Sequence, residues 1–323
     1  MRRNRVYRDG ELVRSDVPFG HLQDELARPG TVVWVDLCEP TPDDLALLAE
    51  AFSLSPLAVE DALTERQRPK VDLYRDHIYL ALYAVTFDAA AGLSTTELAV
   101  FASRRYLVTV RKEEGAFDMD HVVAHWDELP MLAASGVGFL LYGLIDVVVD
   151  GHFDAVQQLD DTIEDVEDEL FSDRGPDRAL QRRTFLLRKW LAQLRRVVLP
   201  MREVLNALLR RDLQIVDDRL QPYYQDVYDH VLRVGEWSDS LRDFLNTILE
   251  TNLTIQGNRL NDIMKVLTGW AAVIAVPTAI TGFFGMNVLF PAFGTHGGFY
   301  FSLFLVVGST IGIYALMRSR HWL

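Results

Sequence analysis

The chain has 323 residues, with 46 acidic against 32 basic side chains and a formal net charge of −14. This balance disfavours nucleic acid as a partner, because phosphate binding needs a basic surface, and it is compatible with attracting cations. Cys38 is the single cysteine, which excludes a disulfide framework and a site of several thiolates within one chain.

The N-terminal part, residues 1–135, is predicted to be a mixed α/β domain that stays in the cytoplasm. Its first residues are polar and charged, and no apolar signal-peptide core follows them. Residues 31–37 are rich in β-branched side chains, which indicates a strand. Thr41 and the residues after it supply cap chemistry for one helix, and Ser55-Pro56 opens a second, short one.

Three apolar, aromatic-rich runs follow and are predicted to be successive antiparallel strands: 77–87, 93–102 and 106–110. Gly92 and Arg104-Arg105 separate them, as turn residues do between paired strands. The domain has no glycine-rich phosphate loop in a strand–helix setting and no nucleophile elbow. Because no nucleophile–base constellation is visible either, the sequence predicts that the protein is not an enzyme.

Residues 136–220 are predicted to form an antiparallel pair of helices, joined by a turn at 172–176. The segment 154–169 carries eight acidic residues and no basic one, whereas 178–211 carries ten basic residues and a single acid. Salt bridges between the helices, each worth about 0.3–0.5 kcal/mol, are one explanation of these opposite charges. The other is that part of the acidic helix faces cations, which makes Asp161 a candidate regulatory metal residue.

A stalk helix is predicted within residues 221–287. No proline lies between Pro222 and Pro277, so residues 226–276 are expected to form one unbroken helix, roughly 75 Å long at 1.5 Å per residue. A helix of that length needs a partner for its inner face.

Two C-terminal stretches, 266–284 and 299–317, contain 19 residues each and no charged side chain. As helices, both are long enough to cross a hydrocarbon core of about 30 Å, so two transmembrane helices in contact with lipid are predicted. Basic residues precede the first span and form the tail 318–323 after the second, whereas the loop 288–298 has no charge. The positive-inside rule therefore predicts a multi-pass protein of the cytoplasmic membrane with both termini in the cytoplasm.

One face of the first span is small or weakly polar. A 4-3-4-3 spacing backward from the span's end selects Gly282, Thr278, Ala275, Ala271 and Thr268. Asn261 and Met264 lie on the same face at the cytoplasmic end, and Leu267 is included with them as a pore or gate candidate. Small residues often serve close helix packing in membranes. The alternative is a narrow pore formed by several copies of this helix, because one helix cannot enclose a channel.

The first span ends in Gly285-Met286-Asn287, which resembles the G-M-N signature of the CorA family of magnesium and cobalt transporters. Other segments resemble the family in register with it: the second long helix (199–205), the start of the stalk (226–230), the start of the pore helix (261–268) and the terminal Trp322-Leu323. The resemblance covers about residues 55–323.

This resemblance implies an α+β cytoplasmic domain followed by a long stalk helix and two transmembrane helices, assembled as a funnel-shaped homopentamer. It also implies a selectivity filter of Gly285, Met286 and Asn287 at the outer mouth, where a hydrated Mg²⁺ is held. Mg²⁺ dehydrates reluctantly and prefers octahedral oxygen, so backbone carbonyls and the Asn287 amide can contact its water shell without stripping it. A carboxylate ring would bind the ion more tightly and slow its release.

The resemblance further implies that cytoplasmic Mg²⁺ acts as a regulatory ligand between subunits. Asp88, at a strand end, and Asp226, at the stalk start, match such sensor positions, and Asp226 would face Asp88 of a neighbouring subunit. Without the resemblance, both would be interpreted as solvated surface aspartates.

The outer loop departs from many members of the family, because it carries no acidic residue and His296 is its only polar ligand type. A zinc transporter of the same fold, resembling ZntB, therefore stays an alternative, since imidazole suits Zn²⁺. A membrane-anchored scaffold or sensor is a third possibility, although a tether needs no polar helix face.

Overall fold

The computed structural model describes these parts of the chain: residues 2–64, 68–113, 115, 117–170, 178–210, 215–286, 294–320 and 322. They form two compact units, Met1–Asn246 and Thr247–Leu323. Helix α7, Gln221–Phe284, begins in the first unit and ends in the second.

The first unit is built on a mixed sheet, in which the described part of the chain supplies seven strands in the order β2-β1-β3-β7-β6-β5-β4. They are β1 Arg2–Arg8, β2 Glu11–Ser15, β3 Thr31–Cys38, β4 Lys70–Leu73, β5 Ile78–Asp88, β6 Gly92–Ala102 and β7 Tyr106–Arg111. β3 and β7 run parallel, and the other neighbours are antiparallel. The four strands predicted from apolar runs are confirmed, and so is the antiparallel pairing of the last three.

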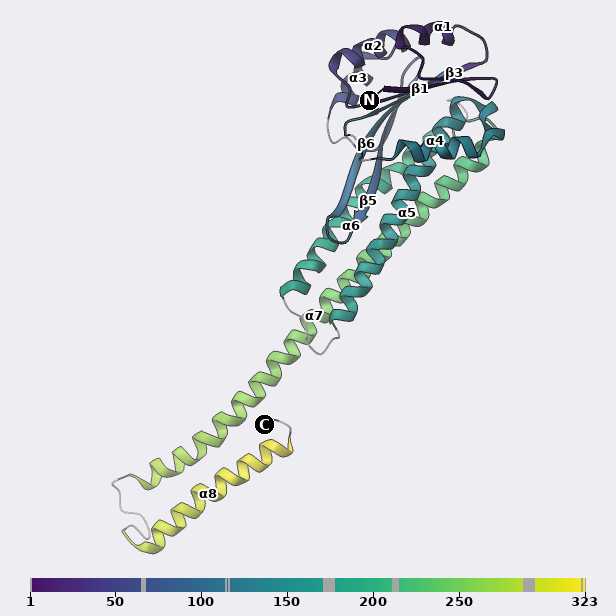
Figure 1. Ribbon diagram of the computed structural model, residues 1–323. Coiled ribbons are helices and arrows are strands. Elements are labelled where there is room, and N and C mark those ends of the chain that lie inside the picture. The colour runs from purple at the N-terminus through teal and green to yellow at the C-terminus, as the bar shows by residue number, and fades with distance from the viewer. Residues whose placement is uncertain are drawn as a thin grey trace. The chain divides into compact units, whose positions relative to one another are not determined.

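Helices cover both faces of this sheet (Figure 1), which is why its inner strands are almost continuously apolar. On one side lie α1 Leu22–Leu26, α2 Pro42–Phe52 and α3 Pro56–Leu63; on the other lie α4 Met119–Glu128 and α5 Val137–Leu170. Short 3₁₀ turns, Phe19–His21 and Pro130–Ser135, precede α1 and α5. Leu48 and Phe52 of α2 pack against Tyr79 and Phe101 of the sheet in a single buried core. Opposite them, Trp126 of α4 meets Trp34 edge-on, with ring centroids 4.9 Å apart.

The two helix starts predicted near Thr41 and Pro56 are confirmed. Thr41 is the N-cap of α2: its hydroxyl accepts from the Asp44 N–H, and the Asp44 carboxylate accepts from the Thr41 N–H. This reciprocal capping box satisfies two backbone donors that the first turn leaves without partners. Pro42 and Pro56 occupy the first turns of their helices, where a missing N–H costs nothing.

Helix α6, Arg178–Leu208, runs back along α5 as predicted. Arg183 of α6 donates to Glu169 of α5 at 2.7 Å, and this ion pair joins the two helices in the described part of the chain. Most of the other acids of residues 154–169 face away from the buried apolar stripe of α5. Asp160 instead accepts from the Trp237 indole N–H of α7 at 3.0 Å. Mutual salt bridging therefore explains little of the acidic segment. The predicted turn at 172–176 lies outside the described residues.

Helix α7 is unbroken over the predicted stretch 226–276 and continues through the predicted first span to residue 284. It begins at Gln221, with Pro222 in its first turn, and it passes through Pro277 to end at Phe284. A proline can lie inside a membrane helix where neighbouring groups satisfy the freed backbone carbonyl.

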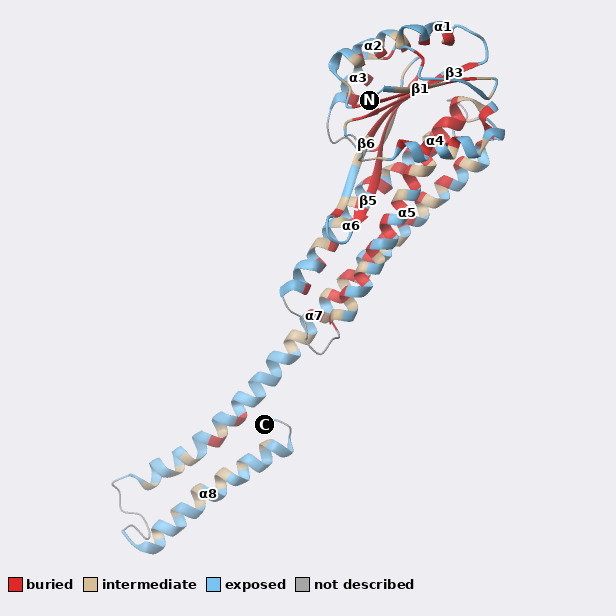
Figure 2. Cartoon of the chain, in the orientation of Figure 1, coloured by how far each residue is buried: buried red, intermediate tan, exposed pale blue. Residues whose placement is uncertain are grey.

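The second unit contains the end of α7 and the helix α8, His296–Ser319. Both helices are long and apolar enough to cross a membrane, as predicted, and little of either span is buried: 11% of the apolar stretch of α7 and 0% of that of α8. Figure 2 shows the contrast between this unit and the buried interior of the first. Exposed apolar surface of this extent requires lipid or other protein to cover it.

Candidate functional site

The candidate pore face of α7 is exposed along its whole length in the single chain. Its members are Asn261, Met264, Leu267, Thr268, Ala271, Ala275, Thr278 and Gly282. The buried positions of the same helix segment, Gly269 and Val273, lie on the opposite side at 100° per residue. The face that the spacing selected is thus one that this chain leaves uncovered.

Polar side chains on this face are few: Asn261, Thr268 and Thr278. The Thr278 hydroxyl donates to the Ile274 carbonyl at 2.7 Å, which leaves its oxygen able to accept from a water molecule. At the end of the face farther from the G-M-N motif, Lys265 and Asp262 form an ion pair at 2.9 Å, so their charges compensate beside Met264. The face therefore carries weak dipoles and no net charge, which suits passage of a cation without tight binding.

The structure describes two of the three residues of the G-M-N motif. Gly285 and Met286 continue the last turn of α7, with N–H groups that donate to Thr281 at 2.9 Å and Phe283 at 3.3 Å. A Cβ at Gly285 would lie 3.1 Å from the Thr281 carbonyl oxygen, which is tighter than ordinary contact. Asn287 lies outside the described residues, so its part in a filter stays a prediction.

His296, the loop residue that raised the zinc alternative, is exposed at the start of α8. Thr295 caps this helix by accepting from the Gly298 N–H at 3.2 Å. The ring is thus available to solvent at the end of a candidate span.

Asp88 ends β5 and shapes the turn into β6. One of its carboxylate oxygens accepts from the Ala90 and Ala91 N–H groups, at 2.9 and 2.7 Å. The turn packs on Trp190 of α6 so closely that a Cβ at Gly92, whose φ is +92°, would lie 2.7 Å from the indole nitrogen. This structural role of Asp88 was not predicted. It occupies one carboxylate oxygen and leaves the other able to contact a cation.

Asp226 and Asp161 are also exposed. Asp226 lies in the second turn of α7, with Oδ2 3.8 Å from Nε2 of His230, and Asp161 faces outward from α5. Within the described residues of one chain, no group of three or more His, Cys, Asp or Glu side chains is arranged to hold a metal ion. The structure does not bring Asp88, Asp161 and Asp226 together in one chain.

A cluster of titratable side chains that the sequence did not predict lies between α4 and α5. Nε2 of His125 is 3.2 Å from Oδ2 of Asp146, and the Tyr142 hydroxyl donates to the same oxygen at 3.2 Å. Burial raises the pKa of Asp146, and the Asp150 charge adds to this, whereas His125 opposes it. Burial likewise raises the pKa of Asp150, against the influence of His230. Helical spacing places Tyr142, Asp146 and Asp150 on one side of α5, and tertiary packing adds His125 of α4 and His230 of α7.

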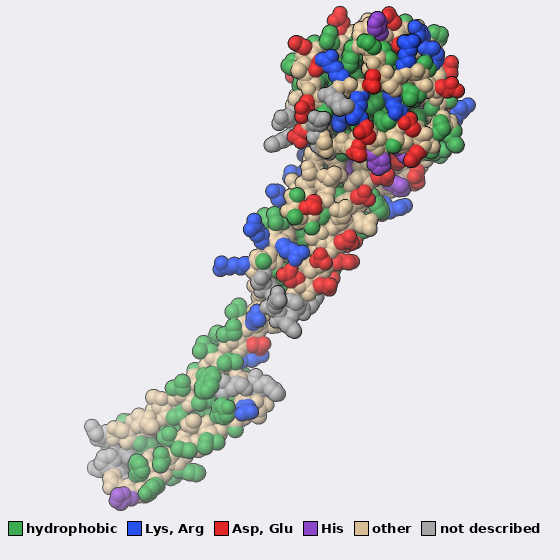
Figure 3. Space-filling model, viewed as in Figure 1, with side chains coloured by type: hydrophobic (Ala, Val, Ile, Leu, Met, Phe, Trp, Pro, Cys, Tyr) green, Lys and Arg blue, Asp and Glu red, His purple; other side chains and the backbone are tan. Residues whose placement is uncertain are grey.

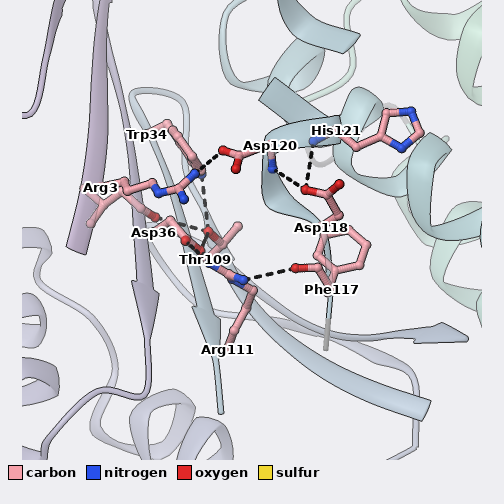
Figure 4. A network of polar contacts seen from close by, with 10 residues as sticks. Arg3, Trp34, Asp36, Thr109, Arg111, Phe117, Asp118, Asp120 and His121 are labelled. Carbon is pink, nitrogen blue, oxygen red and sulfur yellow. Dashed lines mark hydrogen bonds and ion pairs between the residues drawn. The ribbon is translucent and has the colours of Figure 1, made fainter. Parts of the chain in front are cut away.

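A buried polar network holds α4 in place beside this cluster (Figure 4). Arg111 of β7 makes two bonds to Asp36 of β3, at 2.6 and 3.2 Å, and Thr109 donates to the same carboxylate at 2.7 Å. Arg111 also donates to the Phe117 carbonyl at 3.1 Å, just before Asp118 caps α4. Both charges of the pair are almost fully buried and paired, so the network fixes the start of α4 on the sheet.

Comparison with known proteins gives a family match over most of the chain. The family model of the CorA-like Mg²⁺ transporter protein matches residues 29–319. The cobalt/magnesium transport protein CorA of Thermotoga maritima is 29% identical over 260 residues, which are 80% of this chain and 73% of that protein. The zinc transport protein ZntB of Yersinia enterocolitica is 27% identical, over 93% of this chain and 90% of that protein.

A solved structure shares the fold. The complete structure of the CorA magnesium transporter from Methanocaldococcus jannaschii superposes with a TM-score of 0.77 at 24% identity, covering 90% of this chain and 92% of that one. The likeness includes both the sheet domain and the long helix, so the expected fold class of an α+β domain, a stalk helix and two candidate spans is confirmed.

Proposed function

The chain belongs to the family of CorA-like Mg²⁺ transporter proteins, and from that premise we propose that it is a channel that moves Mg²⁺, and also Co²⁺, across the cytoplasmic membrane. The observation that carries the proposal is the small, weakly polar face of α7, exposed along a helix of membrane-spanning length that leads into Gly285 and Met286. A polar face directed at lipid is unfavourable, so this face is expected to line water or to contact other copies.

The pore requires several copies of the chain, and we propose the homopentamer that the family resemblance implies. Exposed apolar side chains surround the candidate face on α7, including Leu260, Ile263, Trp270 and Ile274. Contacts between neighbouring copies and with lipid would cover them, while the small face turns inward to the axis. Met264 and Leu267, both more than half exposed, would narrow the cytoplasmic end.

Mg²⁺ is favoured as the ion because the face and the motif offer neutral oxygen groups. Neutral oxygens can contact the water shell of Mg²⁺, which it releases reluctantly. Co²⁺ is octahedral and hydrated in the same way, and a relative is named for both ions.

A zinc transporter is the second candidate, and one specific residue favours it. His296 is exposed at the start of α8, and a ring of such imidazoles would attract Zn²⁺. The match to the relative named as a zinc transport protein extends over 93% of this chain, compared with 80% for the cobalt/magnesium transport protein of Thermotoga maritima.

Cytoplasmic Mg²⁺ is proposed to close the channel by binding between subunits, at sites that include Asp88, Asp226 and Asp161. Their exposure supports this, because exposed carboxylates can meet residues of a second copy. Like charges held close at low Mg²⁺ repel one another, and a bound divalent ion neutralises them. The ion shifts the gate only by its differential affinity for the closed and open arrangements.

Ion flux through the purified protein in liposomes tests the proposal. We expect Mg²⁺ and Co²⁺ to enter without a proton gradient, and Asn287→Ala or Gly285→Ala to abolish that flux while the oligomer persists. Gly308→Ala, on α8 with nothing within 4 Å of the added Cβ, is the matched control for Gly285→Ala and should transport normally. Flux of Zn²⁺ alone would favour the second candidate, and no flux of any divalent ion would contradict both.

The proposed orientation has a test of its own. A cysteine at Thr295 should react with a membrane-impermeant reagent added to intact cells, and one at Ser319 should not, because both termini are placed in the cytoplasm. Labelling of Ser319→Cys alone would reverse the orientation.

A further inference from the structure

A groove of about 950 Å³ opens in the first unit, and its described lining residues include none from α7. The turns β4–β5 and β6–β7, the end of α2 and helix α1 form its walls. Its volume lies within the range of roughly 300–1,000 Å³ that small-molecule sites occupy. The transport function makes no use of it.

The rim of this groove is basic in a chain of net charge −14. Arg75, Arg104 and Arg105 line it, against Asp76 as its one acid. Arg105 donates to the Leu26 carbonyl at 3.0 Å. Arg75 and Arg104 are exposed, and neither forms an ion pair within the described part of the chain. Guanidinium groups left without carboxylate partners in so acidic a protein are suited to an anionic ligand.

The walls below this rim are aromatic. The rings of Tyr74 and His77 stack, with centroids 5.1 Å apart and planes 16° from parallel, and Tyr106 packs edge-on against Phe52. His77 is only 5% exposed. Its Nδ1 has no hydrogen-bond partner among the described residues. Burial lowers the pKa of this imidazole, so it adds a flat neutral ring and not a charge.

We propose that this groove binds a nucleotide, with the phosphates on Arg75 and Arg104 and the base on the partly exposed ring of Tyr74, whose other face stacks on the buried His77. Arginine presents a planar fork of donors that matches phosphate oxygens. Bases stack on aromatic rings with little dependence on their identity. A simple inorganic anion would use the rim and leave the aromatic wall empty, so the combination selects a phosphorylated molecule with a planar ring.

Calorimetric titration of the full-length protein in detergent tests this with ATP, inorganic triphosphate and adenosine as separate ligands. A magnesium-free buffer keeps the result independent of the proposed ion sites and of transport. We expect saturable ATP binding that is tighter than binding of either fragment. The double variant Arg75→Gln/Arg104→Gln should weaken ATP binding about tenfold or more, because charge-assisted bonds are lost.

Arg188→Gln is the matched control, because Arg188 is an exposed arginine of α6 outside the groove, and it should leave ATP affinity unchanged. Tyr74→Leu should bring the affinity for ATP down to that for triphosphate while triphosphate binding stays the same. Thermal unfolding of each variant reports whether the fold is kept. If Tyr74→Leu does not fold, the double variant Arg75→Gln/Arg104→Gln, at exposed positions, still tests the proposal. The proposal is overturned by absence of saturable ATP binding, by triphosphate binding as tightly as ATP, or by equal weakening in Arg188→Gln.

Discussion

Helices α5 and α8 are both rich in apolar residues, yet the two units use them in opposite ways. α5 buries one side, including Leu144, Val148 and Val156, against the sheet and its neighbouring helices, and turns acids outward. α8 has no buried residue in the described part of the chain and exposes Phe304 and Ile311 to the surroundings. On the face drawn in Figure 3, charged side chains are frequent on the first unit and sparse on the second, where apolar ones predominate. The difference teaches that the pattern of apolar residues, and not their number, indicates whether water or lipid is the solvent.

The largest expected difference between the two helices is in the loss of stability when a leucine of each is replaced by alanine. Leu144→Ala, at a fully buried position of α5, should lower the free energy of unfolding by about 2–5 kcal/mol through lost burial and a cavity. Leu303→Ala, on α8 and 47% exposed, should cost less than about 1 kcal/mol, because lipid or detergent fills the space left. Thermal unfolding of the two purified variants gives the comparison. Equal destabilisation would mean that α8 is packed like a core helix.

Acid should destabilise the first unit through His152 in particular. This imidazole is fully buried on α5, its Nε2 is 2.7 Å from the Tyr83 carbonyl, and burial lowers its pKa to about 4. The unfolded chain binds the proton near pH 6.5 and the folded chain does not, so stability is full above pH 6.5 and falls as pH drops towards 4. The loss should reach about 3 kcal/mol at 1.36 kcal/mol per pKa unit.

Unfolding of the wild type and of His152→Gln across this pH window gives the measurement. The variant should lose most of the pH dependence, since its amide can still donate to the Tyr83 carbonyl but takes no proton. His121→Gln, at an exposed position, should retain it. Equal pH dependence in the wild type and in His152→Gln would show that His152 titrates normally.

A smaller effect is expected at the exposed aspartates. Asp88→Asn/Asp226→Asn should blunt inhibition by cytoplasmic Mg²⁺, because the like charges that the ion neutralises, worth several tenths to a few kcal/mol, are gone. The amide oxygen at 88 can still accept from Ala90 and Ala91, so the turn is kept. Flux at increasing Mg²⁺ and Mg²⁺-dependent protection from protease both report the change. A double variant inhibited and protected at wild-type Mg²⁺ concentrations would place the sensor elsewhere, with Asp161 as the next residue to test.

Apolar pattern and helix-start chemistry were sufficient to predict most of the fold. The runs that became β5, β6 and β7 are apolar because both sheet faces are covered, and Thr41 marks α2 by its cap. The hairpin β1–β2 escaped prediction because β1 contains four arginines, which reach out to acids such as Asp127 and Glu25. A strand whose side chains pair outward lacks the apolar alternation on which sequence reasoning depends.

The candidate pore face could be predicted because it lies on one helix, where spacing alone decides which residues share a side. The Asp146 cluster and the Arg-rich groove could not, because each collects side chains from separate elements. Only the tertiary fold brings Arg75 of one turn near Arg104 of another. The role of Asp88 in its turn was missed for a related reason, since an aspartate at a strand end is equally typical of a turn and of a metal site.

Accessibility of single cysteines along α7 tests the central claim, that its small face lines the ion path, most directly. Ala275→Cys lies on this face, and Ile280→Cys lies about 140° away around the helix at 100° per residue. In transporting liposomes, a water-soluble thiol reagent should modify Ala275→Cys and stop Mg²⁺ flux, whereas Ile280→Cys should react slowly and keep its flux. Block of flux at Ile280→Cys with none at Ala275→Cys would contradict the account, because the ion path would then follow the other side of the helix.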